Sequence, residues 1–147
     1  MSSRRILLVL GLSVMAAIAT AEQYSAVTLK IIMQDLRYDT EKVFDALLTD
    51  DFVVVAETAE RIADHPKIPD LQVARVVAEL GPEMAAFKQF DMRVHDAAAA
   101  MRSAALHGDR AVMQRSFQDM TNGCLACHAA YRQRVKSALE GATSKVP

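Results

Sequence analysis

The sequence predicts an all-α protein, an antiparallel four-helix bundle, from three observations. The 147 residues are 52% hydrophobic but only 5% aromatic, whereas strands favour aromatic and β-branched residues. Five Gly and four Pro leave few residues for the turns of a β-sandwich. Apolar residues recur at intervals of three and four, the spacing of one helix face, and no stretch alternates with period two for long. A chain of this length suits one such domain.

Charge and hydropathy exclude two further classes of protein. The formal net charge is −1, from 17 Lys and Arg against 18 Asp and Glu, whereas a nucleic-acid binder would be expected to carry a basic excess. We therefore expect no nucleic-acid partner. The apolar content also excludes a disordered chain.

Residues 1–21 are predicted to be a cleaved signal peptide. Arg4 and Arg5 precede an apolar run over 6–18, and Ala19-Thr20-Ala21 has the small-residue pattern of a cleavage site. The run is shorter than the roughly 20 residues of a membrane-spanning helix, so a retained anchor is the less favoured alternative. We expect export to the periplasm and no stable membrane insertion after cleavage.

The single domain is predicted over 22–140, followed by a polar tail over 141–147. One helix is expected from about 23 to 48, with Met33 on its apolar stripe. A second is expected to end at His65, because the α conformation is disfavoured for a residue that precedes a proline, here Pro66. Asp70 is expected to cap a segment over 71–80. The remaining helices are expected over about 83–107 and 110–140.

Turn and cap residues support these boundaries. Thr49-Asp50-Asp51 offers caps for the second helix, and Asp109 offers one for the last. Gly108 suits a left-handed helix end, and His107 before it is interpreted as a helix-end charge.

Both cysteines lie in the motif Cys124-Leu125-Ala126-Cys127-His128. C-x-x-C-H is the attachment signature of c-type haem. Positions i, i+3 and i+4 share one face of a helix, so two thiols can form thioethers with one porphyrin edge while the adjacent imidazole ligates the iron. We therefore predict one covalent haem c, with His128 as the proximal iron ligand.

Three other interpretations of the motif are weaker. A thioredoxin-like pair needs a strand before the helix, and none is predicted. A zinc site would need a fourth ligand such as His65 or His95, and free thiols suit an oxidising compartment poorly. A disulfide between positions i and i+3 of a helix would be strained.

The C-terminal part of the chain resembles the class II c-type cytochromes, which comprise cytochrome c′ and its low-spin relatives. The matching residues are Gly108-Asp109, Phe117, the C-x-x-C-H motif and Tyr131-Arg132. The N-terminal part lacks the family's frequent Tyr-Arg pair, so the resemblance is only architectural there. It implies the bundle fold and a haem environment that includes Tyr131 and Arg132, although a solvated position for Arg132 is equally favoured.

The resemblance also raises the question of the sixth iron ligand. Low-spin relatives use a Met from the first helix, whereas members like cytochrome c′ have an apolar side chain there and a five-coordinate iron. Met33 is the only Met of the first helix after cleavage, so we predict it as the distal ligand. The alternatives are that Met33 is a core residue, or that Ile32 is the apolar occupant.

The remaining candidates are assigned structural roles. Five methionines are expected in the core or at its boundary: Met84, Met92, Met101, Met113 and Met120. Met120, one turn before Cys124, is also a candidate to pack on the ring. His65 and His95 are interpreted as a helix-end group and a solvated group. A basic rim for an acidic partner is less favoured than a solvated face for three side chains: Arg115, Arg134 and Lys136.

These features predict a periplasmic one-electron carrier that acts with redox partner proteins. No carboxylate is visibly paired with a His and no Ser or Thr has an evident base, so an enzyme is not expected. A five-coordinate protein that binds nitric oxide or another small gas is the first alternative. A metal-free or zinc-stabilised binding module is the second. The family often pairs through its first two helices, which leaves a homodimer open.

Overall fold

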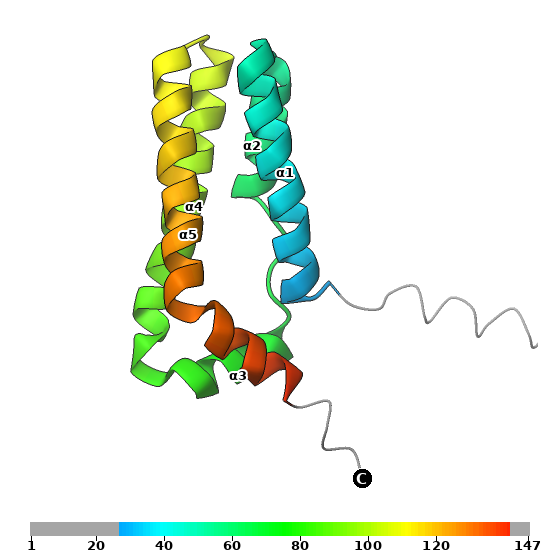
Figure 1. Ribbon diagram of the computed structural model, residues 1–147, viewed down its shortest axis with the longest axis vertical. Helices are drawn as coiled ribbons and strands as arrows, with labels where there is room; N and C mark the ends of the chain where they lie inside the picture. Colours follow the sequence, from blue (N-terminus) through cyan, green and yellow to red (C-terminus); the bar gives the residue numbers. More distant parts are fainter. Residues whose placement is uncertain (1–26, 142–147) are drawn as a thin grey trace, which may run out of the picture.

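The structure, a computed structural model, describes residues 27–141, and within them all regular structure is helical. Figure 1 shows α1, α2, α4 and α5 running side by side, while α3 lies across one end. This arrangement confirms the predicted all-α four-helix bundle. The helices and one 3₁₀ turn are α1 (Leu29–Thr49), α2 (Phe52–Ala63), α3 (Asp70–Leu80), η1 (Gly81–Glu83), α4 (Met84–Leu106) and α5 (Arg110–Glu140). The predicted signal peptide and polar tail lie outside the described residues.

Two predicted helix starts are wrong. α1 begins at Leu29 rather than near residue 23, because Thr28 is extended and its side chain accepts a hydrogen bond from the Ile31 N–H. Gln72 of α3 accepts a second hydrogen bond, from the Leu29 N–H, at 2.7 Å. The other correction concerns α3, whose N-cap is Pro69, so that Asp70 is the first helical residue and not the cap.

The predicted caps of α2 and α5 are confirmed. Asp51 and Asp109 each accept a hydrogen bond from the backbone N–H three residues on, and Gly108 has the left-handed φ of 70°. Asp50, with φ 59°, turns the chain between α1 and α2 and forms an ion pair with Arg110. The two turns therefore lie together at one end of the bundle.

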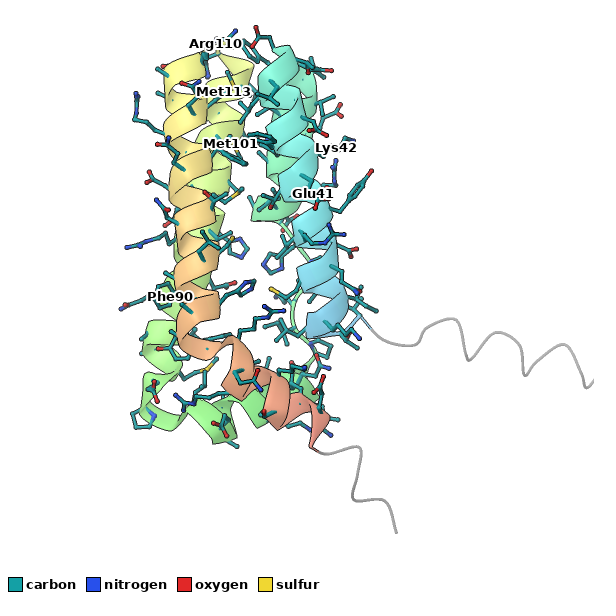
Figure 2. All side chains as sticks on the ribbon, in the orientation of Figure 1. Glu41, Lys42, Phe90, Met101, Arg110 and Met113 are labelled. Carbon is teal, nitrogen blue, oxygen red and sulfur yellow. The ribbon has the colours of Figure 1, made fainter. Side chains whose placement is uncertain are left out.

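Alanine and methionine fill much of the core. Figure 2 shows Met101 and Met113 in the interior, and both are fully buried, as is Met120. Met84 is half-buried, but Met92 is 55% exposed, so its prediction as a core or boundary residue is wrong. Near α3 lies a second cluster, here named the α3-end cluster. Its buried members are Leu29, Val76, Leu80, Tyr131 and Val135. None of the helices over 27–141 is long and apolar enough to cross a membrane.

Candidate haem site

The C-x-x-C-H motif lies on α5, with its two thiols half-buried. Cys124 and Cys127 are free and not bonded to each other. Burial raises the pKa of both thiols, and the neighbouring charges of Cys124 and Asp91 raise the pKa of Cys127 further. His128, next to Cys127, is exposed. The motif therefore presents two protonated thiols and an accessible imidazole on one helix.

One aromatic contact relates α1 to α5. The ring of Phe44 stacks on the ring of Phe117 with centroids 6.0 Å apart. Figure 1 shows the two helices antiparallel, with the N-terminal end of α1 near the C-terminal part of α5. At that end, Leu29 belongs to the same α3-end cluster as Tyr131. Residues of α1 before Phe44 are therefore matched by residues of α5 after Phe117.

This register brings Met33 and His128 to corresponding positions. Met33 is eleven residues before Phe44, and His128 is eleven residues after Phe117. Eleven residues make close to three turns of about 3.6 residues, so each side chain returns to the face that carries the phenylalanine. Regular helix geometry would thus place Met33 and His128 at the same level, on the faces of α1 and α5 that carry Phe44 and Phe117.

Met33 is not on the buried stripe of α1, contrary to the prediction. Its exposed fraction is 38%, whereas the neighbouring Ile32 is 1% exposed. The buried stripe consists of Leu29, Ile32, Asp39, Val43 and Ala46. Met33 is one residue away from this stripe, which is about 100° around the helix, and it shares the face of Phe44, which contacts α5.

The predicted surroundings of the motif divide between core and surface. Tyr131 is buried and meets the ring of Phe87 edge-on, with centroids 5.6 Å apart. Met120 is also buried, as a member of the main core, while Arg132 is exposed. Half-buried Cys127 packs on the α3-end cluster. An apolar setting for two thiols beside an imidazole fits a covalently bound haem.

Arg134 does not form part of a free basic rim. It binds Glu79 at 3.1 Å and Glu83 at 2.8 Å. These ion pairs hold the C-terminal part of α5 beside α3 and η1, towards which α5 turns in Figure 1. Lys136 lies 3.9 Å from Glu140 on its own helix.

A cluster of two histidines and a carboxylate was missed by the sequence analysis. The side chain of His95 is only 26% exposed, so the solvated position predicted for it is wrong. His65 follows the end of α2 as predicted, but its side chain is only 13% exposed. The Nε2 atoms of His65 and His95 lie 3.8 Å and 3.7 Å from the two carboxylate oxygens of Asp91. The spacing of Asp91 and His95, four residues apart on α4, could have indicated this pair. Nothing local indicated His65, which follows α2.

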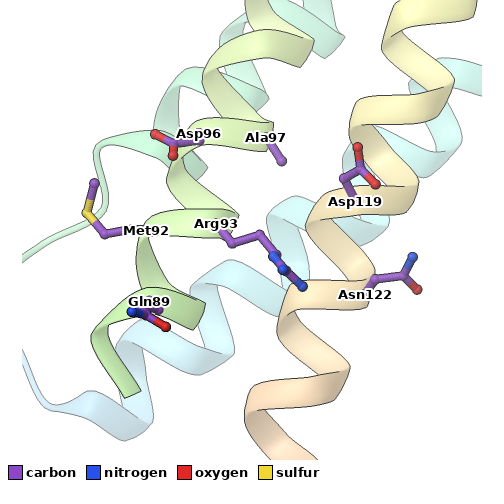
Figure 3. Close-up of a pocket in the computed structure, with 7 residues that line it drawn as sticks. All are labelled: Gln89, Met92, Arg93, Asp96, Ala97, Asp119 and Asn122. Carbon is purple, nitrogen blue, oxygen red and sulfur yellow. The ribbon is translucent and has the colours of Figure 1, made fainter. Parts of the chain in front are cut away.

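The helix-end role predicted for His107 agrees with its contacts, since its Nδ1 donates to the carbonyl oxygen of Ser103 at 2.7 Å. Figure 3 shows a surface hollow between α4 and α5. It is lined by Gln89, Met92, Arg93, Asp96, Ala97, Asp119 and Asn122. No cysteine or histidine lines it.

A helical bundle whose last long helix carries C-x-x-C-H with free thiols defines a c-type haem protein. A comparison with protein families supports this class, because the model described as Cytochrome C' matches residues 26–132. The chain belongs to the cytochrome c′ family, which implies a haem cofactor with iron. Proteins of this family are typically periplasmic. Comparisons with curated proteins and with solved structures found no significant match.

Proposed function

We propose that this protein is a periplasmic electron carrier with one haem c joined to Cys124 and Cys127. In this proposal His128 is the proximal ligand and Met33 the sixth ligand. The haem iron supplies the one-electron couple. The corresponding positions of Met33 and His128, each eleven residues from the stacked Phe44 and Phe117, carry the proposal.

The chain's own residues suit such a carrier in two ways. A thioether ligand opposite an imidazole raises the reduction potential relative to a nitrogen ligand. The stacked rings of Phe44 and Phe117, together with Leu29 in the α3-end cluster, hold α1 relative to α5 on either side of Met33. These contacts restrict the motion of α1 relative to α5, which limits how far a ligand on α1 can move relative to one on α5.

A five-coordinate protein that binds nitric oxide or another small gas is the second candidate. One observation favours it: Met33 is 38% exposed and belongs to neither hydrophobic cluster. A side chain with so little packing is less firmly positioned than a buried ligand. In this candidate function Met33 stays away from the iron.

Optical spectra of the purified holoprotein distinguish the two candidates. Met33 ligation predicts low-spin spectra in both oxidation states and little reaction with carbon monoxide, and Met33→Leu converts them to high-spin spectra that respond to it. Met92→Leu is the matched control, since Met92 is exposed on α4. High-spin spectra in the unsubstituted protein, unchanged by Met33→Leu, would instead support the gas-binding protein.

We further propose cleavage after Ala21, export to the periplasm and exchange of electrons with redox partner proteins, without a catalytic role. The family's typical location and the signal-like pattern of residues 1–21 support export. Mass spectrometry of the periplasmic fraction tests this point. The expected mass is that of residues 22–147 plus one haem, whereas an uncleaved chain in the membrane fraction would contradict it. Sedimentation of the same sample tests for the homodimer.

A further inference from the structure

Three ligand-bearing side chains meet where α2 ends beside α4. His65 follows α2, and Asp91 and His95 lie one turn apart on α4. One ligand atom from each lies within 4.8 Å of the other two. The imidazole rings are 4.7 Å apart between centroids, tilted by 40°. The cluster therefore gathers two nitrogens and a carboxylate around one point.

Hydrogen bonds to the main chain orient both imidazoles. Nδ1 of His65 donates to the carbonyl oxygen of Pro66 at 2.9 Å, and Nδ1 of His95 donates to that of Ala63. A carbonyl oxygen only accepts, so each Nδ1 carries a proton. In the neutral ring Nε2 then holds a lone pair. A backbone carbonyl on the other ring nitrogen is the usual support of a metal-bound histidine.

The distances suit ligands of one cation better than direct hydrogen bonds. At 3.7 and 3.8 Å, the contacts from Nε2 to the carboxylate oxygens exceed the hydrogen-bond range. Ligands at about 2.1 Å from a tetrahedral zinc ion are separated by roughly 3.4 Å. The distances from Nε2 to the carboxylate would shorten by a few tenths of an ångström around such an ion, and no pair of the three ligand atoms, all within 4.8 Å of one another, would have to close by more than about 1.4 Å.

We propose that His65, Asp91 and His95 form a binding site for a divalent transition-metal cation of the Zn²⁺ type, separate from the haem iron. Two neutral imidazoles and one carboxylate form a common ligand set for such ions, with water completing the coordination. Asp91 is 51% exposed in its side chain, which gives the ion an entry path from solvent.

The site lies near the haem attachment but uses different donors. Val94, the neighbour of His95 on α4, lies 3.1 Å from where a Cβ would stand on Gly123, the neighbour of Cys124 on α5. The proposed ligands nevertheless include neither cysteine nor His128. A cation there would add positive charge close to the thioether bonds without replacing an iron ligand.

Calorimetric titration of the EDTA-treated holoprotein with Zn²⁺ tests the proposal. We expect one ion per chain and a loss of affinity of at least tenfold in each of three variants, His65→Gln, Asp91→Asn and His95→Gln. His107→Gln is the matched control, because His107 also donates from Nδ1 to a carbonyl oxygen but lies at the far end of α4. It should bind Zn²⁺ like the unsubstituted protein.

X-ray absorption at the zinc edge identifies the ligands directly. Two imidazoles with oxygen ligands, and an unchanged haem spectrum on zinc addition, would support the proposal. Three outcomes would overturn it: no zinc binding, equal affinity in all three cluster variants and the unsubstituted protein, or a sulfur ligand at about 2.3 Å. A thermal melt of each variant verifies that the bundle is folded.

Discussion

Phe44 of α1 and Phe117 of α5 stack with their ring planes inclined by only 25°. They connect two helices that otherwise pack mainly on other partners, α1 on α2 and α5 on α4. The contact fixes the register in which the Met33 side of α1 meets the His128 side of α5. Its strength therefore bears on both stability and iron coordination.

Phe44→Ala is predicted to lower the free energy of unfolding by about 1 kcal/mol, since the ring is half-exposed and loses one aromatic pair. If Met33 ligates the iron, the high-spin fraction should rise as well. Urea denaturation and optical spectra of the holoprotein measure these effects. Tyr38→Ala, which removes a 61% exposed ring from the same helix, is the control. An equal loss in both variants would argue against a special role for the contact.

Arg61→Ala is predicted to lower the free energy of unfolding by about 2 kcal/mol. Arg61 donates to the buried Asp39 carboxylate from Nε at 3.1 Å and from a terminal nitrogen at 2.6 Å. Removing it leaves a buried charge without its partner. Asp39→Ala in the same background should recover part of the loss. A cost below about 0.5 kcal/mol in urea denaturation would mean that the pair behaves like an exposed salt bridge.

Gly123→Ala is predicted to destabilise the contact between α4 and α5 by about 1 kcal/mol. A Cβ at Gly123 would meet Val94 Cγ2 at 3.1 Å, and the branched valine has little freedom to move. In a Val94→Ala background the clash disappears, so the same change should become neutral or stabilising through the helix preference of alanine. Thermal melts of the four proteins measure the difference. A loss that persists in the second background would refute the steric explanation.

The ion pair of Asp50 and Arg110 is predicted to stop stabilising the folded state at acid pH. The Arg110 guanidinium lowers the pKa of Asp50 from its ordinary value of 3.8. A carboxyl group whose pKa is lower in the folded state stabilises that state at pH values above its pKa in the unfolded chain. This contribution is lost as the pH falls through the pKa of the folded state. Melting temperatures of the protein and of Asp50→Asn, whose asparagine tolerates the left-handed backbone, should differ by a small constant amount above about pH 5 and converge below pH 4.

High salt should also reduce the Asp50 difference, since both side chains are exposed. A difference between the two proteins that is independent of pH would instead point to a backbone effect of the substitution.

Local chemistry explains what could be predicted from the sequence. The caps at Asp51 and Asp109 and the turn at Gly108 depend on neighbouring residues, and all three are confirmed. The start of α1 was missed because the cap at Thr28 is reinforced by a hydrogen bond that the Leu29 N–H donates to Gln72, a residue distant in sequence. A helical period alone does not contain that information.

The candidate site also has one part that the sequence predicts and other parts that only the tertiary structure reveals. The C-x-x-C-H motif is readable because its spacing is internal to one helix. The exposure of Met33 depends on how α1 is rotated between α2 and α5, which periodicity fixes only to within about one residue. The meeting of His65 with Asp91 and His95 depends on where α2 ends beside α4. Each of these features requires the tertiary arrangement.

The cysteines lie close to the midpoint of α5, the longest helix, with more than three turns on either side. Helix ends open and close far more often than helix centres, because terminal residues have fewer hydrogen bonds to break. Fraying at Arg110 or Glu140 would therefore not reach the thioether bonds. Amide hydrogen exchange in the holoprotein should be slowest around Cys124 and fastest in the terminal turns.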